Sequence, residues 1–314
     1  MLRFVMTRVG MALPTLLIVS VSVFVLIRLI PGDPAQLLLG DLADPAALED
    51  MRRRMGLDQT WLQQFIIWFG HLLQGDLGQS ISTGESVLNL VWSRFLVSAQ
   101  VVVAAVLLAA LVAVPAGIIA AWRQNSALDL VMVGAATLLV SIPTFWLGLL
   151  LLLFFGLKLS WLPVVGYVSF GQDARAAALY LIMPILTLFL HEIGVLMRMA
   201  RASALEVLRL DYVTHARAKG LSERVVLMRH VFKNSFGPTW TLIGLVLGNL
   251  LGGIAVVETV FTIPGLGRLL VDSIYSRDYP VIQGCLLFVA VVYVVVNLVI
   301  DLLYPVFDPR VTAE

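Results

Sequence analysis

Cysteine and charge are both scarce in this chain of 314 residues. A single cysteine, Cys285, excludes an internal disulfide framework and any thiolate metal cluster supplied by this chain alone. Charged residues make up 13% of the sequence, whereas they make up about 25% of an average soluble domain. The 21 basic and 20 acidic residues nearly balance. No basic field therefore favours a nucleic acid as a partner.

Signatures of enzyme active sites are also lacking. No G-x-x-x-x-G-K-[ST] phosphate-binding loop occurs, so the chain has no such loop with which to hydrolyse ATP itself. His191 and Glu192 begin like a zinc-peptidase H-E-x-x-H motif, but Val195 stands where the second histidine must be. The four histidines have no metal-ligand spacing. We therefore expect no catalytic residue, metal site or cofactor in this chain.

What the sequence has in excess is apolar residues, which make up 60% of it, with a mean hydropathy of +0.96. A bilayer core about 30 Å thick needs roughly 20 helical residues to cross it. Apolar stretches of this kind predict an all-α membrane protein with six transmembrane helices, at about 9–27, 95–122, 130–157, 176–197, 234–257 and 279–300. The first is interpreted as a retained helix, because the Pro-Gly-Asp-Pro turn that follows it is no small-residue cleavage site.

The distribution of lysine and arginine predicts the orientation. With the N-terminus inside, the inner segments hold twelve of the 21 basic residues, so both termini are expected in the cytoplasm. The long segment 31–94 then lies outside, with predicted helices at 45–56 and 59–73. Five apolar residues share one face of the second helix: Trp61, Phe65, Trp68, Phe69 and Leu72. Such a face suits the headgroup level of a bilayer or packing on the spans, and both remain open.

The inner segment 198–235 is the most informative extramembrane stretch. We expect one amphipathic helix over 203–219, with an apolar stripe made of Leu205, Leu208, Tyr212 and Ala216. Gly220 is placed to end it as a left-handed C-cap. Ser222 can then cap a second helix that runs from about 223 to 233. This unit either lies on anionic lipid headgroups or docks a soluble partner.

Within and near the spans, a few residues invite either a structural or a functional interpretation. Gly244, Gly248 and Gly252 recur every four residues, which favours close helix packing or a smooth pathway lining. Pro115, Pro143 and Pro184 are expected to mark kinks. Glu192 is costly in a span, so we expect it near the inner edge, where it snorkels or is protonated; a contact with the substrate is the alternative. Glu258 and Asp272 fall in a predicted outer loop, 258–278, and are expected to be solvated.

A series of motifs, in order along nearly the whole chain, resembles one family. The longest are F-V-L-I-R-L-I-P-G-D-P at 24–34, G-D-L-G-Q-S at 75–80, D-Y-x-x-x-A-R-A-K-G at 211–220 and E-T-V-F-x-x-P-G-L-G-R at 258–268. Shorter matches lie at 56–59, 161–163, 229–234, 277–280, 297 and 308–310. In these motifs the chain resembles the membrane permease subunits of bacterial dipeptide, oligopeptide and nickel ABC importers.

The resemblance implies a type I ABC importer permease fold. Its parts would be the first transmembrane helix within 1–30, an extracytoplasmic helical insertion at 31–94, a five-helix core at 95–307 with a cytoplasmic coupling segment at 201–235, and a cytoplasmic tail at 308–314. The residues implied to couple to the ATPase are Leu208, Asp211, Tyr212, Ala216, Arg217, Ala218, Lys219 and Gly220. Residues expected along the translocation path or its gate are Gly244, Gly248, Gly252, Glu258, Pro264 and Gly265. Thr214 and His215 depart from the family's E-A-A-x-x-x-G loop.

The resemblance also implies partners. They are a second, homologous permease subunit forming a heterodimer, two ATP-binding cassette subunits that bind ATP and Mg²⁺, and an extracytoplasmic substrate-binding protein. The expected location is the bacterial inner membrane, where the lipid bilayer surrounds the spans, and the implied solute is a dipeptide, oligopeptide, glutathione or nickel chelate. A secondary transporter driven by an ion gradient is the alternative, but it predicts intramembrane acid pairs and inverted repeats that the sequence does not display.

Overall fold

The computed structural model describes residues 2–29, 34–39, 44–54 and 56–307. Regular structure in these ranges is helical, apart from one β-bridge between Gln79 and Ser86, which confirms the all-α prediction. The α-helices are α1 (Leu2–Leu29), α2 (Pro34–Leu39), α3 (Pro45–Arg54), α4 (Trp61–Leu73), α5 (Val87–Trp122), α6 (Ala127–Ser141), α7 (Thr144–Leu151), α8 (Ala174–Leu208), α9 (Asp211–Ala218), α10 (Glu223–Val225), α11 (Lys233–Gly253), α12 (Ala255–Phe261), α13 (Leu266–Ser276) and α14 (Tyr279–Phe307). Two π-helical stretches join some of them: η1 (Leu152–Lys158) and η2 (Val226–Phe232).

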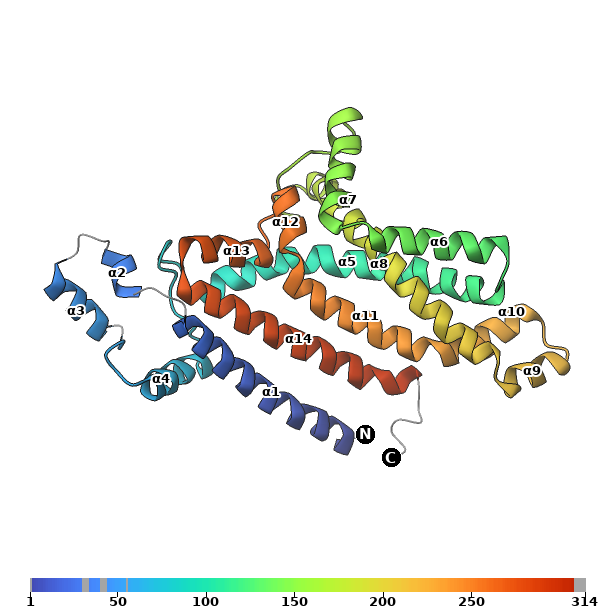
Figure 1. Cartoon of the computed structure of the whole chain (residues 1–314), viewed down its shortest axis with the longest axis horizontal. Coiled ribbons are helices and arrows are strands. Elements are labelled where there is room, and N and C mark those ends of the chain that lie inside the picture. Colours follow the sequence, from blue (N-terminus) through green and yellow to red (C-terminus); the bar gives the residue numbers. More distant parts are fainter. Residues whose placement is uncertain (1, 30–33, 40–43, 55, 308–314) are drawn as a thin grey trace.

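Six membrane spans are present if each bent helix pair counts as one span. Four single helices are long and apolar enough to cross a bilayer, within α1, α5, α8 and α14. The other two candidates are the pairs 127–141 with 144–158 and 223–253 with 255–261, which bend by 97° and 56°. Figure 1 shows α1, α5, α11 and α14 running along the long axis of the molecule. The chain is therefore a multi-pass membrane protein.

The third predicted span, 130–157, is not one straight helix. α6 ends at Ser141 and α7 starts at Thr144, with Ile142 in extended conformation between them. Pro143 explains the break, because it lacks an N–H donor and disfavours a helical conformation at the residue before it. α5 and α8, by contrast, continue through Pro115 and Pro184. Figure 1 shows α7 projecting from the bundle at a steep angle to α6.

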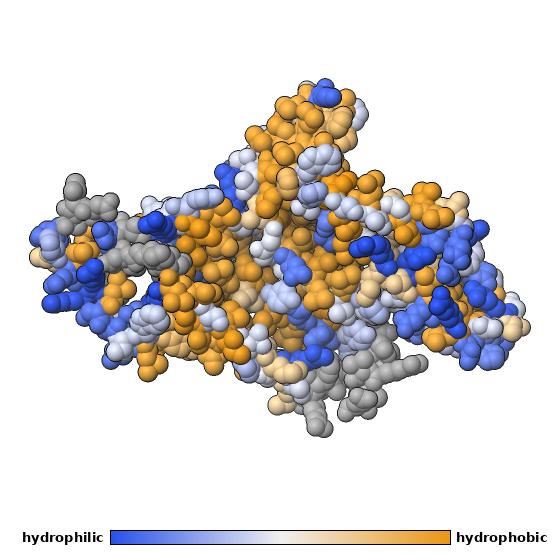
Figure 2. Space-filling view, viewed as in Figure 1, coloured by the Kyte–Doolittle hydropathy of each residue, from blue (hydrophilic) through white to orange (hydrophobic). Residues whose placement is uncertain are grey.

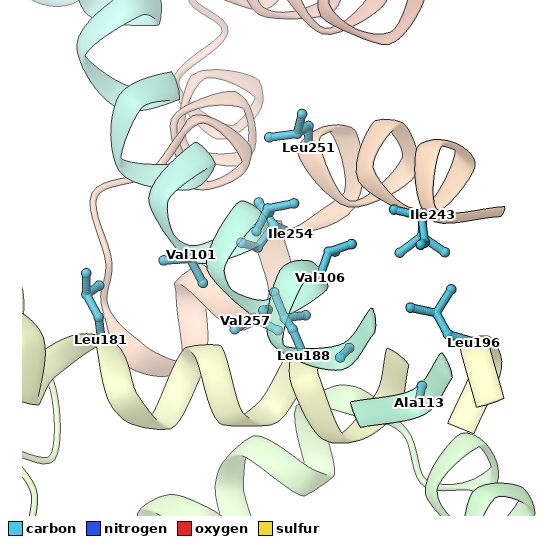
Figure 3. Close-up of a cluster of buried hydrophobic side chains, with 14 of the residues drawn as sticks. Val101, Val106, Ala113, Leu181, Leu188, Leu196, Ile243, Leu251, Ile254 and Val257 are labelled. Carbon is cyan, nitrogen blue, oxygen red and sulfur yellow. The ribbon is translucent and has the colours of Figure 1, made fainter. Parts of the chain in front are cut away.

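α8 lies in the middle of the bundle and packs on α5, α6 and α11. Its contact with α5 is close because small, buried residues recur every four positions along α5: Ala105, Ala109, Ala113, Gly117 and Ala121. A Cβ atom on Gly117 would lie 2.6 Å from the carbonyl oxygen of Met197. Small residues at this spacing let two backbones approach closely. In Figure 3, Leu188 and Leu196 of α8 gather with core residues of α5 and α11.

The glycine repeat of α11 faces α14. Cβ atoms added to Gly244, Gly248 and Gly252 would meet side chains of α14, namely those of Ile300, Tyr293 and Val289 respectively. The geometry thus favours the packing interpretation of this repeat. A pathway role for the three glycines stays a prediction.

Glu192 differs from its predicted setting. Its side chain is buried among the helices, with 5% of the residue exposed, rather than extending to the inner edge of the span. The reason is its register on α8, four residues after Leu188 and four before Leu196, which are both buried in the main core. The snorkelling prediction for Glu192 is therefore wrong.

The 34–86 region contacts the spans at two places. On α4, Phe65 and Trp68 pack on Phe24 of α1 with ring centroids 5.2 and 5.5 Å away, so this face packs on a span. Trp61 is exposed, and its placement at the headgroup level stays a prediction. Farther along, Asp278 accepts hydrogen bonds from the hydroxyls of Ser80 (2.6 Å) and Ser82 (2.7 Å). The backbone N–H groups of Ile81 and Ser82 also donate to this carboxylate.

The surface divides by polarity along the long axis. Figure 2 shows orange, apolar side chains over the middle of the visible face, where the long helices lie. Blue, polar side chains gather near α3 at one end and near α9 and α10 at the other. An apolar middle between two polar ends is the distribution expected for a chain that crosses a bilayer.

Candidate functional site

Residues 209–232 are the part of the predicted 201–235 coupling segment that lies between α8 and α11, and they keep the name coupling segment. They form one polar end of the molecule (Figure 1). The segment consists of α9, a glycine turn, α10 and η2, and it continues directly into α11. The predicted single helix over 203–219 is wrong, because the chain breaks at Arg209 and Leu210 between α8 and α9. The second predicted helix does begin at Glu223, but it does not stop near Lys233. Ser222 is its N-cap residue, although its side chain makes no capping hydrogen bond.

The break changes which residues of α9 are buried. Tyr212 was expected in the apolar stripe, yet it is 38% exposed, while its neighbour Val213 is fully buried. Two non-helical residues reset the helical phase, so that Val213 rather than Tyr212 follows the buried face of α8. Ala216 is buried as expected, at 6% exposure. Leu205 and Leu208 are partly buried at the edge of this contact.

A small apolar core holds the coupling segment on the bundle. It comprises Ala121 of α5, Ala204 and Val207 of α8, Val213 and Ala216 of α9, and Val226 and Val231 of η2. Each fully buried valine stabilises such a cluster by about 1.5–3 kcal/mol. The segment is thus packed on the C-terminal ends of α5 and α8.

Gly220 forms the turn after α9, as predicted. Its φ is +80°, in the left-handed region that favours glycine. Its N–H donates to the carbonyl of Arg217 at 2.9 Å, and the N–H of Leu221 reaches the carbonyl of Ala216 at 3.4 Å. These bonds satisfy carbonyl groups at the end of the helix and direct the chain toward Glu223.

Glu223 joins the segment to α5. One carboxylate oxygen accepts a hydrogen bond from Arg217 Nε at 2.8 Å. The other accepts from Trp122 Nε1 at 3.0 Å and from Arg217 Nη2 at 3.2 Å. Because Trp122 is the last residue of α5, this carboxylate ties α9 and the following helix to the end of a central span.

A second carboxylate joins α6 to α8 at the same end. Asp129 accepts hydrogen bonds from Arg201 Nε at 2.6 Å and Nη2 at 2.7 Å, which makes the ion pair bidentate. The Asp129 side chain is buried. Asp129 also accepts from the backbone N–H of Asn125 at 3.0 Å, which fixes the turn between α5 and α6. Paired geometry of this kind is stronger than a single ionic contact.

The surface that the coupling segment exposes, on the side away from the bundle, is partly apolar. Leu210, Leu221, Val225 and Met228 are 45%, 40%, 38% and 64% exposed. Among the residues that the resemblance marked for coupling, Ala216 is buried and Leu208 is partly buried. The exposed ones are Asp211, Tyr212, Arg217, Ala218, Lys219 and Gly220. The two departures from the family loop, Thr214 and His215, are exposed on α9 as well.

At the opposite end, the turn between α12 and α13 brings together Glu258, Pro264 and Gly265. Glu258 was expected in solvent, but it is fully buried, so that prediction is wrong. Its carboxylate accepts from Ser98 Oγ at 2.5 Å and from the N–H of Arg268 at 2.8 Å, while Ser98 Oγ accepts from the N–H of Leu266. Glu258 and Ser98 together satisfy backbone donors in the first turn of α13. Asp272 is exposed, as expected.

Several of these residues were missed by sequence reasoning. Ser98, Arg201 and Glu223 act through partners 160, 72 and 101 residues away, which no local pattern reveals. The alanine repeat of α5 could have been found by the same four-residue spacing that identified the glycines of α11. Within the described residues, no group of three or more His, Cys, Asp or Glu side chains could hold a metal ion.

The comparisons with known proteins agree with this architecture. The family model of the binding-protein-dependent transport system inner membrane component matches residues 113–313, and its N-terminal model matches residues 1–102. The glutathione transport system permease protein of Escherichia coli O6:H1 is 41% identical over 311 residues, which cover 99% of both chains. The dipeptide transport system permease protein of Alkalihalophilus pseudofirmus is 37% identical over 331 residues, again covering 99% of both chains.

A crystal structure of an amino acid ABC transporter with histidines aligns with this chain at a TM-score of 0.48 and 16% sequence identity. The alignment covers 71% of this chain and 94% of that chain. Full-length sequence similarity and two family models carry the assignment. The chain belongs to the family of binding-protein-dependent transport system inner membrane components, and it is the membrane permease subunit of an ABC importer.

Proposed function

We propose that this permease subunit moves peptides or a related small solute, such as glutathione or a nickel chelate, across the bacterial inner membrane. Its relatives transport glutathione and dipeptides by name, and they align over nearly the whole of both chains. Translocation follows alternating access, in which the spans open to one side of the membrane and then to the other. This chain supplies the path and binds neither ATP nor a metal or other cofactor of its own.

The observation that carries the proposal is the construction of the coupling segment. It presents an exposed apolar face with Leu221, Val225 and Met228, while its other face is packed and hydrogen-bonded to α5 and α8. A surface of this kind can receive a soluble partner and pass a displacement to the spans. The partner in this proposal is one of two ATP-binding cassette subunits, which bind ATP and Mg²⁺ and hydrolyse the nucleotide.

The rest of the assembly follows from the same proposal. A second, homologous permease completes the path, and an extracytoplasmic binding protein delivers the solute. The coupling segment and both termini face the cytoplasm, as the lysine and arginine distribution favours. The turn between α12 and α13 then lies near the outer mouth of the path. Closure of the ATPases on ATP draws the coupling segments together and opens the spans outward.

Transport by proteoliposomes that contain the assembled complex tests this function. We expect uptake of a dipeptide or glutathione that requires ATP and the binding protein and persists when a proton uncoupler is added. Gly220→Asp should abolish the stimulation of ATPase activity by the binding protein. Uptake that continues without ATP and stops with the uncoupler would instead establish an ion-driven transporter, and unchanged transport by Gly220→Asp would refute the coupling role.

A further inference from the structure

A small cavity lies beside the turn between α12 and α13. It has a volume of about 220 Å³ and is lined by Arg94, Pro264, Gly265, Arg268, Leu269 and Asp272. Pro264 and Gly265 belong to the predicted gate, whereas the two arginines were assigned no role. Arg94 comes from α5 and Arg268 from α13, so residues about 170 positions apart in sequence converge on one cavity.

The two guanidinium groups keep donors available for a ligand. Arg94 Nη1 donates to the carbonyl oxygen of Pro264 at 3.4 Å, a long bond that uses one of its five N–H groups. Arg268 Nε lies 3.6 Å from an oxygen of Asp272, farther than a strong paired contact, and the Asp272 side chain is 65% exposed. The pair between Arg268 and Asp272 is therefore loose and open to solvent.

Glu258 does not line the cavity, but its carboxylate lies behind the cavity wall and its charge acts on Arg268. It lies directly behind Gly265, because a Cβ atom on that glycine would collide with the Glu258 carboxylate. The Glu258 carboxylate is held on its buried side by Ser98 and by the backbone N–H of Arg268. The charged groups that line the cavity are thus two guanidinium groups and one carboxylate at the rim.

We propose that this cavity binds the free carboxylate of the transported solute, with Arg94 and Arg268 donating to its oxygens. The planar guanidinium fork matches a carboxylate, and two such forks in one concave site select for it. Asp272 gives the rim a negative charge, which suits the ammonium end of a zwitterionic peptide. The inference rests on the proposed function, because the solute class comes from there. It adds a recognition site within the permease, next to the predicted gate.

Direct binding to the assembled complex tests the site without the binding protein. The complex of permeases and ATPases in lipid nanodiscs is titrated with L-alanyl-L-alanine and with its C-terminal amide, and heat or intrinsic fluorescence reports the binding. The two probes differ only at the carboxyl end. We expect the acid to bind at least about tenfold more tightly than the amide, because only the acid offers charged oxygens to the arginines. Glutathione serves as a second acid probe.

Variants assign the preference to the two arginines. Arg94→Gln and Arg268→Gln should each reduce the acid-to-amide preference to about twofold or less, and Arg268→Lys should restore part of it. Arg268→Gln keeps the backbone N–H that donates to Glu258, so we expect this variant to fold. Arg277→Gln is the matched control, because Arg277 is an exposed arginine at the end of α13 that lies outside this cavity. It should keep the full preference.

Several results would overturn the proposal. They are equal binding of acid and amide by the unmodified complex, binding of neither, or a preference that survives both glutamine variants. If Arg268→Gln keeps the preference but weakens stimulation of the ATPase by the binding protein, the arginines contact that protein and the solute site is refuted. Failure of the proposed function is separate, because it shows as absent ATP-dependent uptake by the unmodified complex.

Discussion

The carboxylate of Glu223 accepts a hydrogen bond from the indole N–H of Trp122 at 3.0 Å, across 101 residues of sequence. Trp122 ends α5, and Glu223 begins the helical stretch that leads into the fifth span. The same carboxylate binds Arg217 of α9. This contact therefore connects the coupling segment with the ends of two candidate spans.

Loss of the Glu223 carboxylate should uncouple ATP hydrolysis from transport. Glu223→Gln removes the half-exposed ion pair with Arg217, which contributes about 0.2–1 kcal/mol. It also weakens the hydrogen bond from Trp122, which contributes about 1 kcal/mol. We expect the assembled complex to keep basal ATPase activity and to lose most of its stimulation by the binding protein. Glu206→Gln, at an exposed position of α8, is the control. Equal stimulation in both variants would show that the Glu223 contacts are dispensable.

The left-handed conformation of Gly220 predicts a cost for any side chain there. Gly220→Ala should destabilise the turn by about 1–2 kcal/mol, because a Cβ atom crowds the backbone at this φ. Thermal unfolding of the purified complex and its ATPase stimulation by the binding protein should both decline. Gly134→Ala in α6 is the matched control, since a Cβ atom there meets nothing within 4 Å. A Gly220→Ala complex as stable as the control would contradict the assigned geometry.

The contact between Gly265 and Glu258 predicts that the turn between α12 and α13 tolerates no side chain at position 265. A Cβ atom there would overlap the buried carboxylate and displace it from Ser98 and Arg268. We expect Gly265→Ala to lower uptake by at least about tenfold, since a displaced buried carboxylate loses hydrogen bonds that are costly to leave unmade. Gly171→Ala is the control, because a Cβ atom at this position in the loop before α8 meets nothing within 4 Å, and this variant should transport normally.

The hydrogen bonds that Asp278 accepts from residues 80–82 predict that the stability of the complex depends on pH. Burial raises the pKa of Asp278, but the hydrogen bonds from Ser80, Ser82 and the Ile81 backbone outweigh it and hold the pKa below its ordinary value of 3.8. A lowered folded-state pKa means that the stabilisation is complete above the unfolded value and is lost as pH falls through the folded value.

Asp278→Asn should therefore destabilise the complex by about 2 kcal/mol at neutral pH. The difference in unfolding temperature between variant and unmodified complex should shrink as the pH drops below the ordinary value of 3.8. Ser276→Ala is the control, because Ser276 ends α13 two residues before Asp278 and its hydroxyl donates to other residues. A difference that does not change with pH would show that charge on Asp278 contributes nothing.

How much of this fold could be predicted depended on the range of the interactions involved. Apolar runs located the six spans, because the bilayer demands a fixed length of helix whatever its partners are. The break at Leu210 was missed because neither glycine nor proline marks it, and Val213 was consequently overlooked. Glu258 was misplaced because its burial depends on Ser98, which is 160 residues away. Gly220 was predictable because its role is set by its own backbone angle.

The cavity beside the turn between α12 and α13 likewise combines residues that a local motif identifies with residues that only packing brings together. Pro264 and Gly265 belong to a family motif, whereas no sequence pattern singles out Arg94. Only the approach of α5 to α13 places it opposite Arg268. The two arginines are brought together by helix packing, which a local sequence motif does not predict.

Glu223 and Asp129, two carboxylates at the end of the bundle that carries the coupling segment, each hold two elements together. One fastens the end of α5 to the 217–223 turn, and the other fastens α6 to α8. The coupling segment therefore cannot separate from α5, nor α6 from α8, without breaking these hydrogen bonds.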